Sequence, residues 1–197
     1  MRKHIKRSIR ISRYVIYKET LVDYREKFWS FTGAFAGIAL IAFLQSHFLP
    51  ATENIFLIGS FGASGVLIYG AIQSPLAQPR NLVGGHVLSA FIGVTVYKVC
   101  PDIVWLNAPL AVSLSIIGMQ FSKTMHPPGG ATALIAVTGA DKIKALGYGY
   151  VISPVLTGTL ILLITALVFN NLTPHRRYPT NSRLTRLLGR RWRSRAA

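Results

Sequence analysis

The distribution of charge along the chain constrains its fold most strongly. Of the 22 Lys and Arg residues, nine precede Phe28 and eight follow Pro174, which leaves five in the long apolar middle of the chain. Two basic ends around an apolar middle are typical of an integral membrane protein whose termini both face the cytoplasm. We therefore expect a protein of the bacterial inner (plasma) membrane. In spite of the net charge of +16, we expect no nucleic-acid partner.

The apolar runs predict an all-α, polytopic helical membrane protein with four to six membrane elements. A crossing helix needs about 20 residues, and the runs at 31–49, 82–99, 104–121 and 145–169 meet this length or come near it. The run at 55–72 is marginal, and a sixth run at 128–140 would extend only about 20 Å as a helix. Six spans and four spans with two re-entrant elements both remain open.

Three regions follow from these runs. We expect residues 1–29 to form a basic arm and an interfacial amphipathic helix, whose cationic side chains contact anionic lipid head groups. Residues 30–172 are the predicted transmembrane domain, and residues 173–197 a basic cytoplasmic tail that is disordered or lies on the membrane. Cys100 is the only cysteine, which excludes an internal disulfide and a cysteine metal cluster.

A weak internal repeat relates the two halves of the apolar region. Residues 62–68 (Gly-Ala-Ser-Gly-Val-Leu-Ile) match residues 130–136 (Gly-Ala-Thr-Ala-Leu-Ile-Ala), and residues 85–90 match residues 149–154 in the same order. Small residues are frequent in membrane helices, so coincidence is the alternative. If each copy has three elements, the copies face opposite ways. This predicts a 3+3 inverted repeat with short or broken helices, as in secondary transporters.

The stretch from Lys123 to Leu134 contains a proline pair followed by two glycines, at residues 127–130. Proline is accepted in the first turn of a helix but not in its interior, so a helix should start near Pro128. Small residues there would leave the first N–H groups accessible, and such a helix start attracts anions. The alternative is a tight cytoplasmic turn before an ordinary spanning helix.

These residues resemble the signature of the HPP family of integral membrane proteins. The resemblance rests on residues 126–134 (His-Pro-Pro-Gly-Gly-Ala-Thr-Ala-Leu), 59–64 (Gly-Ser-Phe-Gly-Ala-Ser) and 74–86 (Ser-Pro-Leu-Ala-Gln-Pro-Arg-Asn-Leu-Val-Gly-Gly-His). It covers about Lys27 to Phe169. Family members are usually described with four spanning helices, and plastid and cyanobacterial relatives are associated with nitrite transport. The resemblance therefore implies a transporter or channel for a small inorganic anion, with nitrite as the first candidate.

Binding such an anion requires positive potential and hydrogen-bond donors. A helix start contributes about 0.3–1 kcal/mol, and a bond to Arg or protonated His about 1.5–3 kcal/mol. The candidate substrate-binding residues lie at the two predicted helix starts and in the loop before the third span: Gly62, Ala63, Ser64, Arg80, Asn81, His126, Gly129, Gly130, Ala131 and Thr132. His86 and Lys123 are candidate gating or secondary residues.

Each assignment has a simpler alternative. Arg80 could be a loop charge that sets topology, and His86 a donor satisfied between helices. His126 could cap its turn, or it could gate by titrating near neutral pH. Gly130 is the expected sensitive position, because a side chain there would cover the N–H groups that face the ion.

No enzyme constellation is visible in the sequence. The six acidic residues are scattered, and there is no P-loop and no His/Cys metal spacing. We expect no catalytic residue, no metal and no cofactor. The alternative functions are a non-transporting structural or assembly subunit of a membrane complex, and an intramembrane enzyme. Because a chain of this size often needs partners to enclose a pathway, we expect a homo-oligomer.

Overall fold

Four long helical segments form the framework of the structure, a computed structural model that describes residues 23–48 and 57–180. They are α2 (Tyr24–Phe48), α4 (Pro79–Val99), α5 (Val104–Ser122) and the segment Val151–Phe169, which ends in α8 (Thr157–Phe169). Each is long and apolar enough to cross a membrane. The predicted all-α polytopic membrane fold is therefore confirmed.

The outer surface of the bundle is apolar, whereas part of its interior is polar. Large apolar side chains are exposed along the long helices, for example Phe35 on α2, Trp105 and Phe121 on α5, and Ile164 on α8. Fully buried positions in turn include several Ser, Thr, His and Asn side chains. This distribution is the reverse of that in a soluble domain, and it fits a protein whose surroundings are lipid.

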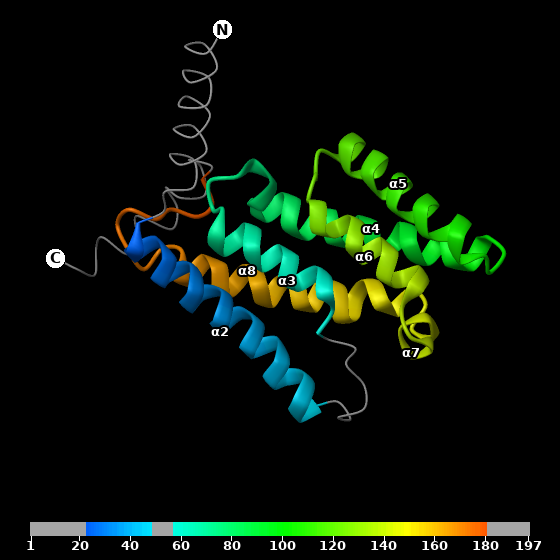
Figure 1. The fold of residues 1–197 in the computed structure, drawn as a ribbon, viewed down its shortest axis with the longest axis horizontal. Coiled ribbons are helices and arrows are strands. Elements are labelled where there is room, and N and C mark those ends of the chain that lie inside the picture. The colour runs from blue at the N-terminus through cyan, green and yellow to red at the C-terminus, as the bar shows by residue number, and fades with distance from the viewer. Residues whose placement is uncertain (1–22, 49–56, 181–197) are drawn as a thin grey trace, which may run out of the picture.

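Two shorter helical elements lie between the long helices (Figure 1). The first is α3 (Gly59–Gly65), continued by the π-helical turn η1 (Val66–Gly70), and the second is α6 (Pro127–Thr138). Hydrogen bonds join Ser60 to Thr132 and Ser64 to His126, each at 2.9 Å, so the two elements run antiparallel. The described residues thus contain four helical segments long and apolar enough to cross a membrane, with α3–η1 and α6 as two shorter elements between them.

Small residues bring α4 and α6 into close contact. A Cβ atom added at Gly93 would lie 2.6 Å from the carbonyl oxygen of Ala133, and one at Gly129 would lie 2.9 Å from the carbonyl oxygen of Gly85. Such distances leave no room for a side chain, so the backbones approach as they do in small-xxx-small membrane contacts. Gly85, Gly93, Gly129 and Ala133 are called the glycine seam below.

The last span begins at Val151, six residues after the start of the apolar run at 145–169. The short helix α7 (Asp141–Ala145) ends before a turn in which Gly147 has φ +51°, a left-handed conformation that favours glycine. The π-helical segment η3 (Val151–Leu156) follows, and Ser153 within it has φ −135° and ψ 122°. Proline disfavours the helical conformation of the residue before it, and Pro154 therefore breaks this span near its start.

The third span also begins at a different residue than its apolar run predicted. The 3-10 turn η2 (Pro75–Ala77) precedes α4, which begins at Pro79 instead of near residue 82. Proline suits this first helical position because its missing N–H would have no partner there. Helix α2 begins at Tyr24, seven residues before the apolar run at 31–49, and the remaining runs agree with their helices to within a few residues. Residues 49–56 lie outside the described residues.

The predicted region boundaries at residues 29 and 173 both fall within ordered structure. Helix α2 begins at Tyr24 and passes through residue 29, since no Pro or Gly interrupts it there. After α8, residues 170–180 pack back onto the bundle, where Tyr178 is buried and donates a hydrogen bond to the carbonyl oxygen of Ala77 at 2.7 Å. Of the arm and interfacial helix predicted over residues 1–29, residues 1–22 lie outside the described residues, as does the tail beyond residue 180.

Candidate functional site

Two buried histidines and one serine lie together inside the bundle. The Oγ atom of Ser64 is 2.6 Å from Nε2 of His86 and 2.9 Å from Nε2 of His126. The centroids of the two imidazole rings are 4.9 Å apart. All three side chains are 0% exposed. A single hydroxyl thus bridges two ionisable groups within a membrane protein, where such groups are costly and mark functional sites.

Further polar contacts continue from the other nitrogen of each ring. Nδ1 of His86 lies 2.7 Å from Oγ1 of Thr132, which donates a hydrogen bond to Oγ of Ser60 at 2.9 Å. Nδ1 of His126 lies 2.8 Å from the carbonyl oxygen of Leu76. The residues Ser60, Ser64, His86, His126 and Thr132 are called the histidine cluster below.

Local sequence explains how each helix presents its part of the cluster. Ser60 and Ser64 are one turn apart on α3 and therefore share a face. His126 precedes Pro127, which keeps it extended (φ −144°, ψ 103°) at the N-cap of α6. His86 follows Gly85 on α4. A Cβ atom added at Gly85 would lie 2.6 Å from Cβ of His126. The approach of the two histidines therefore depends on glycine at position 85.

The structure separates the predicted site residues into two groups. It brings Ser64, His86, His126 and Thr132 together in the cluster, with Gly129 beside them in the glycine seam. Gly62 and Ala63 are exposed, and Gly130 and Ala131 are half-buried. An added Cβ atom at Gly62 would meet nothing within 4 Å. The repeated Gly-Ala-Ser/Thr motif therefore contributes its hydroxyl residue to the cluster.

Three predicted residues lie at one end of the bundle. The exposed Arg80 donates from Nη2 to the carbonyl oxygen of Ser122 at 2.8 Å, and Asn81 donates to the carbonyl oxygen of Met125 at the same distance. Lys123 is exposed and caps α5 in a left-handed conformation with φ 57°. Arg80 and Asn81 thus tie the start of α4 to the loop that precedes α6.

The start of α6 offers fewer N–H groups than the sequence suggested. Pro127 and Pro128 have none, and the N–H of Gly129 already donates to the carbonyl oxygen of His126 at 2.8 Å. Accessible backbone donors at this helix start therefore do not by themselves make an anion site. The side chains of the histidine cluster have to supply the donors.

The two glycines of this turn have different surroundings. A Cβ atom at Gly129 would lie 2.8 Å from Oγ of Ser89 on α4, whereas one at Gly130 would lie 3.8 Å from Val112 on α5, an ordinary contact. The restricted position is therefore Gly129 and not Gly130. Sequence could not separate the two, since adjacent helical residues face different neighbours only once the helices are packed.

Three further polar groups lie around the cluster, and sequence reasoning missed two of them, Ser60 and Tyr150. Ser60 was detectable, because it precedes Ser64 by one helical turn. Ser89 is fully buried, and its hydroxyl has no hydrogen-bond partner among the described residues. The hydroxyl of Tyr150 donates to the carbonyl oxygen of Thr132 at 3.2 Å, a contact that no local pattern indicates.

A second polar cluster lies where α2 begins. Nη2 of Arg176 donates to the carbonyl oxygen of Tyr69 at 2.8 Å and to Oδ1 of Asn170 at 2.9 Å, and Nη1 pairs with Oε2 of Glu26 at 3.0 Å. Arg176 is 1% exposed. Burial lowers the pKa of this guanidinium, and the carboxylate of Glu26 raises it. These four residues are called the Arg176 cluster below.

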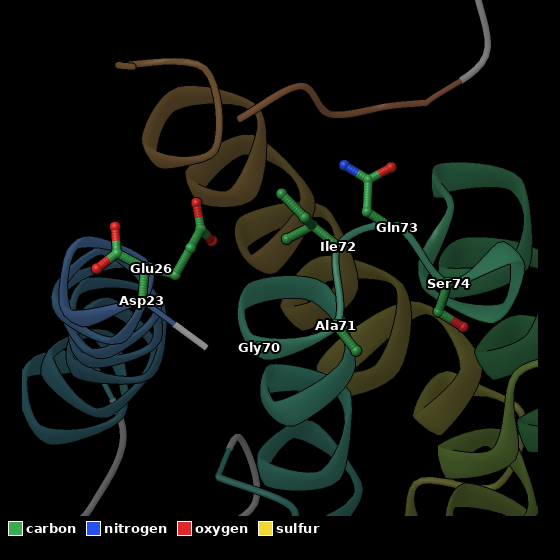
Figure 2. Close-up of a pocket in the computed structure, with 7 residues that line it drawn as sticks. All are labelled: Asp23, Glu26, Gly70, Ala71, Ile72, Gln73 and Ser74. Carbon is green, nitrogen blue, oxygen red and sulfur yellow. The ribbon is translucent and has the colours of Figure 1, made fainter. Parts of the chain in front are cut away.

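A shallow pocket of about 380 Å³ opens beside the Arg176 cluster. Figure 2 shows Asp23 just before α2 and Glu26 in its first turn, across from the turn formed by residues 70–74. Two carboxylates repel anions, so this pocket does not suit the substrate class that the sequence suggested. Within the described residues, moreover, no group of three or more His, Cys, Asp or Glu side chains could hold a metal ion.

Comparison with known proteins agrees with an integral membrane protein. Residues 19–179 match the family model described as the HPP transmembrane region. Two transmembrane proteins of Dictyostelium discoideum are 48% and 46% identical to the chain over 163 residues, which is 80% of its length. The chain spans about half the length of these curated relatives (51% and 56%). No solved structure matches the chain.

Proposed function

Because the chain belongs to the HPP family of integral membrane proteins, we propose that it is a carrier for a small inorganic anion, with nitrite as the first candidate. The histidine cluster is the proposed binding site. The chain acts without catalysis, metal or cofactor in this proposal. The plasma membrane, the inner membrane in a bacterium, is the proposed location.

The composition of the histidine cluster carries the proposal. Its side chains are hydroxyls and imidazoles, which donate hydrogen bonds and become positive when they gain a proton. The acidic residues among those described lie instead at the ends of helices or in turns: Asp23, Glu26, Asp102 and Asp141. A cation site would need carboxylate or carbonyl oxygens. A buried polar site with imidazoles and without a carboxylate favours an anion.

The unpartnered hydroxyl of Ser89 adds a donor at the same place. It lies against Gly129 in the first turn of α6, one turn along α4 from His86. A buried hydroxyl without a partner is unfavourable, and a bound anion would satisfy it. A few charge-assisted bonds, less desolvation, leave about 4 kcal/mol, which corresponds to millimolar affinity and lets the ion leave again.

Passage of an ion requires the cluster to open, since its side chains are 0% exposed. We propose that α3 moves relative to α6. Hydrogen bonds through Ser60 and Ser64 hold α3 against α6, whereas the glycine seam fixes α6 on α4. Hydrogen bonds can be exchanged for bonds to an ion, but an interlocked backbone contact cannot open without displacing a whole helix.

The order of the elements supports the inverted-repeat plan. In Figure 1, α2, α3 with η1, and α4 alternate in direction, and α5, α6 and the segment ending in α8 alternate in the opposite sense. The short elements α3 and α6 are then the corresponding middle elements of the two halves. Such pairs surround the site in secondary transporters, where one half moves relative to the other.

The ends of the described chain support the proposed orientation. Glu26 near the start of α2 contacts Arg176 after α8, so both ends lie on one side of the bundle. The basic arms of residues 1–22 and 181–197 adjoin this side along the chain. We propose that this side faces the cytoplasm, that anionic lipids contact the basic arms, and that the chain forms a homo-oligomer.

Uptake by the purified full chain in liposomes tests the proposal. Nitrite, nitrate, formate and bicarbonate are compared, with protein-free liposomes as the background. We expect nitrite influx above background, and we expect the double variant His86→Gln/His126→Gln to lose at least nine-tenths of it. The control His47→Gln alters an exposed histidine at the end of α2 and should retain influx. Folded protein that carries none of the four anions would refute the proposal and favour a structural subunit.

A further inference from the structure

The histidine cluster holds fewer hydrogens than its contacts require when both imidazoles are neutral. The carbonyl oxygen of Leu76 can only accept, so Nδ1 of His126, 2.8 Å away, carries a hydrogen. Thr132 donates its one hydroxyl hydrogen to Oγ of Ser60 at 2.9 Å or to the carbonyl oxygen of Pro128 at 3.3 Å, and with either bond made Nδ1 of His86, 2.7 Å from Oγ1 of Thr132, is a donor as well. A neutral imidazole has a single N–H. Both Nε2 atoms therefore lack a hydrogen in the neutral state.

The two Nε2 acceptors face the same hydroxyl. The single hydrogen of Ser64 can serve Nε2 of His86 at 2.6 Å or Nε2 of His126 at 2.9 Å, but not both. The carbonyl oxygen of Ser60, 3.1 Å from Oγ of Ser64, competes for this hydrogen too. Lone pairs that face each other at such distances repel. One proton added to either imidazole supplies the missing hydrogen and turns the repulsive contact into a charge-assisted bond.

We infer that His86 and His126 share one added proton through the hydroxyl of Ser64, and that this proton is bound and carried together with the anion. The inference deepens the proposed function and rests on it. The added proton makes the cluster a monovalent cation. A buried charge without a partner is strongly unfavourable, and the bound anion supplies the opposite charge. Proton and anion therefore raise each other's affinity by the same factor.

The surroundings of the two rings contain no other described group that could balance this charge. The cluster is enclosed by α3, α4, α6 and the turn around Leu76. The described charged side chains of these helices and of the loop before α6 are exposed: Arg80, Lys98 and Lys123. Besides His86, the titratable side chain that contacts Thr132 is Tyr150, which donates its hydroxyl hydrogen to the carbonyl oxygen of Thr132. The counter-charge must accordingly come from the ligand.

The arrangement also lets the proton move between the two helices. With the added proton on His126, Nε2–H donates to Oγ of Ser64, and the serine hydrogen is donated to Nε2 of His86. Ser64 accepts the hydrogen from Nε2 of His126 and passes its own hydroxyl hydrogen to Nε2 of His86. His126 is then neutral and His86 is cationic. One N–H and one O–H bond have been broken, one of each has formed, and the total charge is unchanged. The proton passes from α6 to α4 through a residue of α3, the element that we expect to move.

Nitrite accumulation driven by a pH gradient tests the coupling. Proteoliposomes that contain the full chain are prepared at one internal pH, and nitrite is added at a series of decreasing external pH values. Nitrite uptake and the internal pH are followed together. We expect one proton to enter per nitrite, with up to about tenfold accumulation per pH unit and no effect of a membrane potential set by potassium and valinomycin. Protein-free liposomes measure the passage of nitrous acid, which is subtracted.

Two serine variants distinguish the loss of the bridging hydroxyl from a general effect of mutation. Ser64→Ala removes the bridging hydroxyl and should abolish gradient-driven accumulation. Ser115→Ala removes an equally buried hydroxyl on α5 that bonds within its own helix, and should accumulate nitrite as the parent does. Nitrite influx that ignores the pH gradient would overturn the coupling and leave the transport proposal intact. Absence of any influx would refute the transport proposal itself.

A spectroscopic readout remains if Ser64→Ala does not fold. In nanodiscs at pH 7, the ¹⁵N signals of labelled histidine distinguish an N–H nitrogen from a bare one, and His86→Gln and His126→Gln assign them. Added nitrite should convert one of these two residues from the neutral Nδ1–H form to imidazolium. Two neutral histidines at saturating nitrite would overturn the inference.

Discussion

The Arg176 cluster and the histidine cluster balance buried positive charge in different ways. Arg176 is permanently charged, and its guanidinium meets a carboxylate, a carbonyl oxygen and an amide oxygen within 3.0 Å. The histidine cluster has no carboxylate among its contacts, and its bridging hydroxyl has one hydrogen for two imidazole nitrogens. The first cluster contains its own opposite charge in Glu26, although Nε of Arg176 has no hydrogen-bond partner among the described residues. In our proposal, the second cluster gains its positive and negative charges together, when a proton and an anion bind.

Under the proposed function, the difference separates polar groups that hold the fold together from polar groups that serve transport. Arg176 joins residue 69 to the start of α2 and the end of α8, so its contacts bind three segments into one end of the bundle. Ser64, His86 and His126 join α3, the element that we expect to move, to its neighbours through bonds that an ion could replace. Mutations in the Arg176 cluster should therefore reduce stability more than transport, and mutations in the histidine cluster should reduce transport more than stability.

The largest effect should come from Arg176→Met. This change leaves the carboxylate of Glu26 with the exposed His175 as its remaining partner and removes the donor to Asn170, so we expect the free energy of unfolding to fall by about 3 kcal/mol. Unfolding in mixed micelles of increasing SDS content, followed by circular dichroism, measures it. Arg177→Met is the matched control, because the neighbouring side chain is exposed. Equal stability of the two variants would show that the Arg176 cluster is not a structural lock.

The next effect concerns the two glycines at the start of α6. Gly129→Ala places a methyl group 2.8 Å from Oγ of Ser89 and should cost about 1–3 kcal/mol. Gly130→Ala has room and should stabilise the helix by up to about 1 kcal/mol. The same unfolding assay compares them. If Gly130→Ala were the more destabilising variant, α6 would be rotated relative to α4 and the glycine seam would be wrong.

A smaller stability effect with a clear effect on transport is expected for Thr132→Val. The change keeps the shape of the side chain but removes the oxygen that accepts from Nδ1 of His86. We expect the free energy of unfolding to change by about 1 kcal/mol and the half-saturating nitrite concentration to rise about tenfold. Thr138→Val, on the exposed face of the same helix, is the control. Identical uptake curves for the two variants would remove Thr132 from the site.

The smallest effect should follow Arg80→Gln. Arg80 is exposed and bonds the carbonyl oxygen of Ser122, so it can act on the substrate only by long-range attraction. We expect about a twofold rise in the half-saturating nitrite concentration at low ionic strength, which disappears in about 1 M salt as the charge is screened. Lys98→Gln, at the opposite end of α4, is the comparison. An unchanged concentration dependence at low salt would leave Arg80 as a charge that sets topology.

Much of the fold followed from the sequence because its signals are local. Apolar runs set the length of the spans, and the proline pair before α6 set where that short helix begins. Four of the five members of the histidine cluster were named from motifs alone. A polar or titratable residue within an apolar run is energetically unfavourable and therefore indicates a functional site. The break of the last span at Ser153 was missed, although the proline after it carried the signal.

Only the tertiary structure decided which of these residues meet. His86 reaches Thr132 across 46 positions, Ser64 reaches His126 across 62, and Arg176 reaches the backbone of Tyr69 across 107. A local pattern records the length and the polar face of a helix, but not the neighbour against which that face packs. The choice between Gly129 and Gly130, the return of residues 170–180 onto the bundle, and the sharing of one serine hydroxyl by two histidines all depend on that packing.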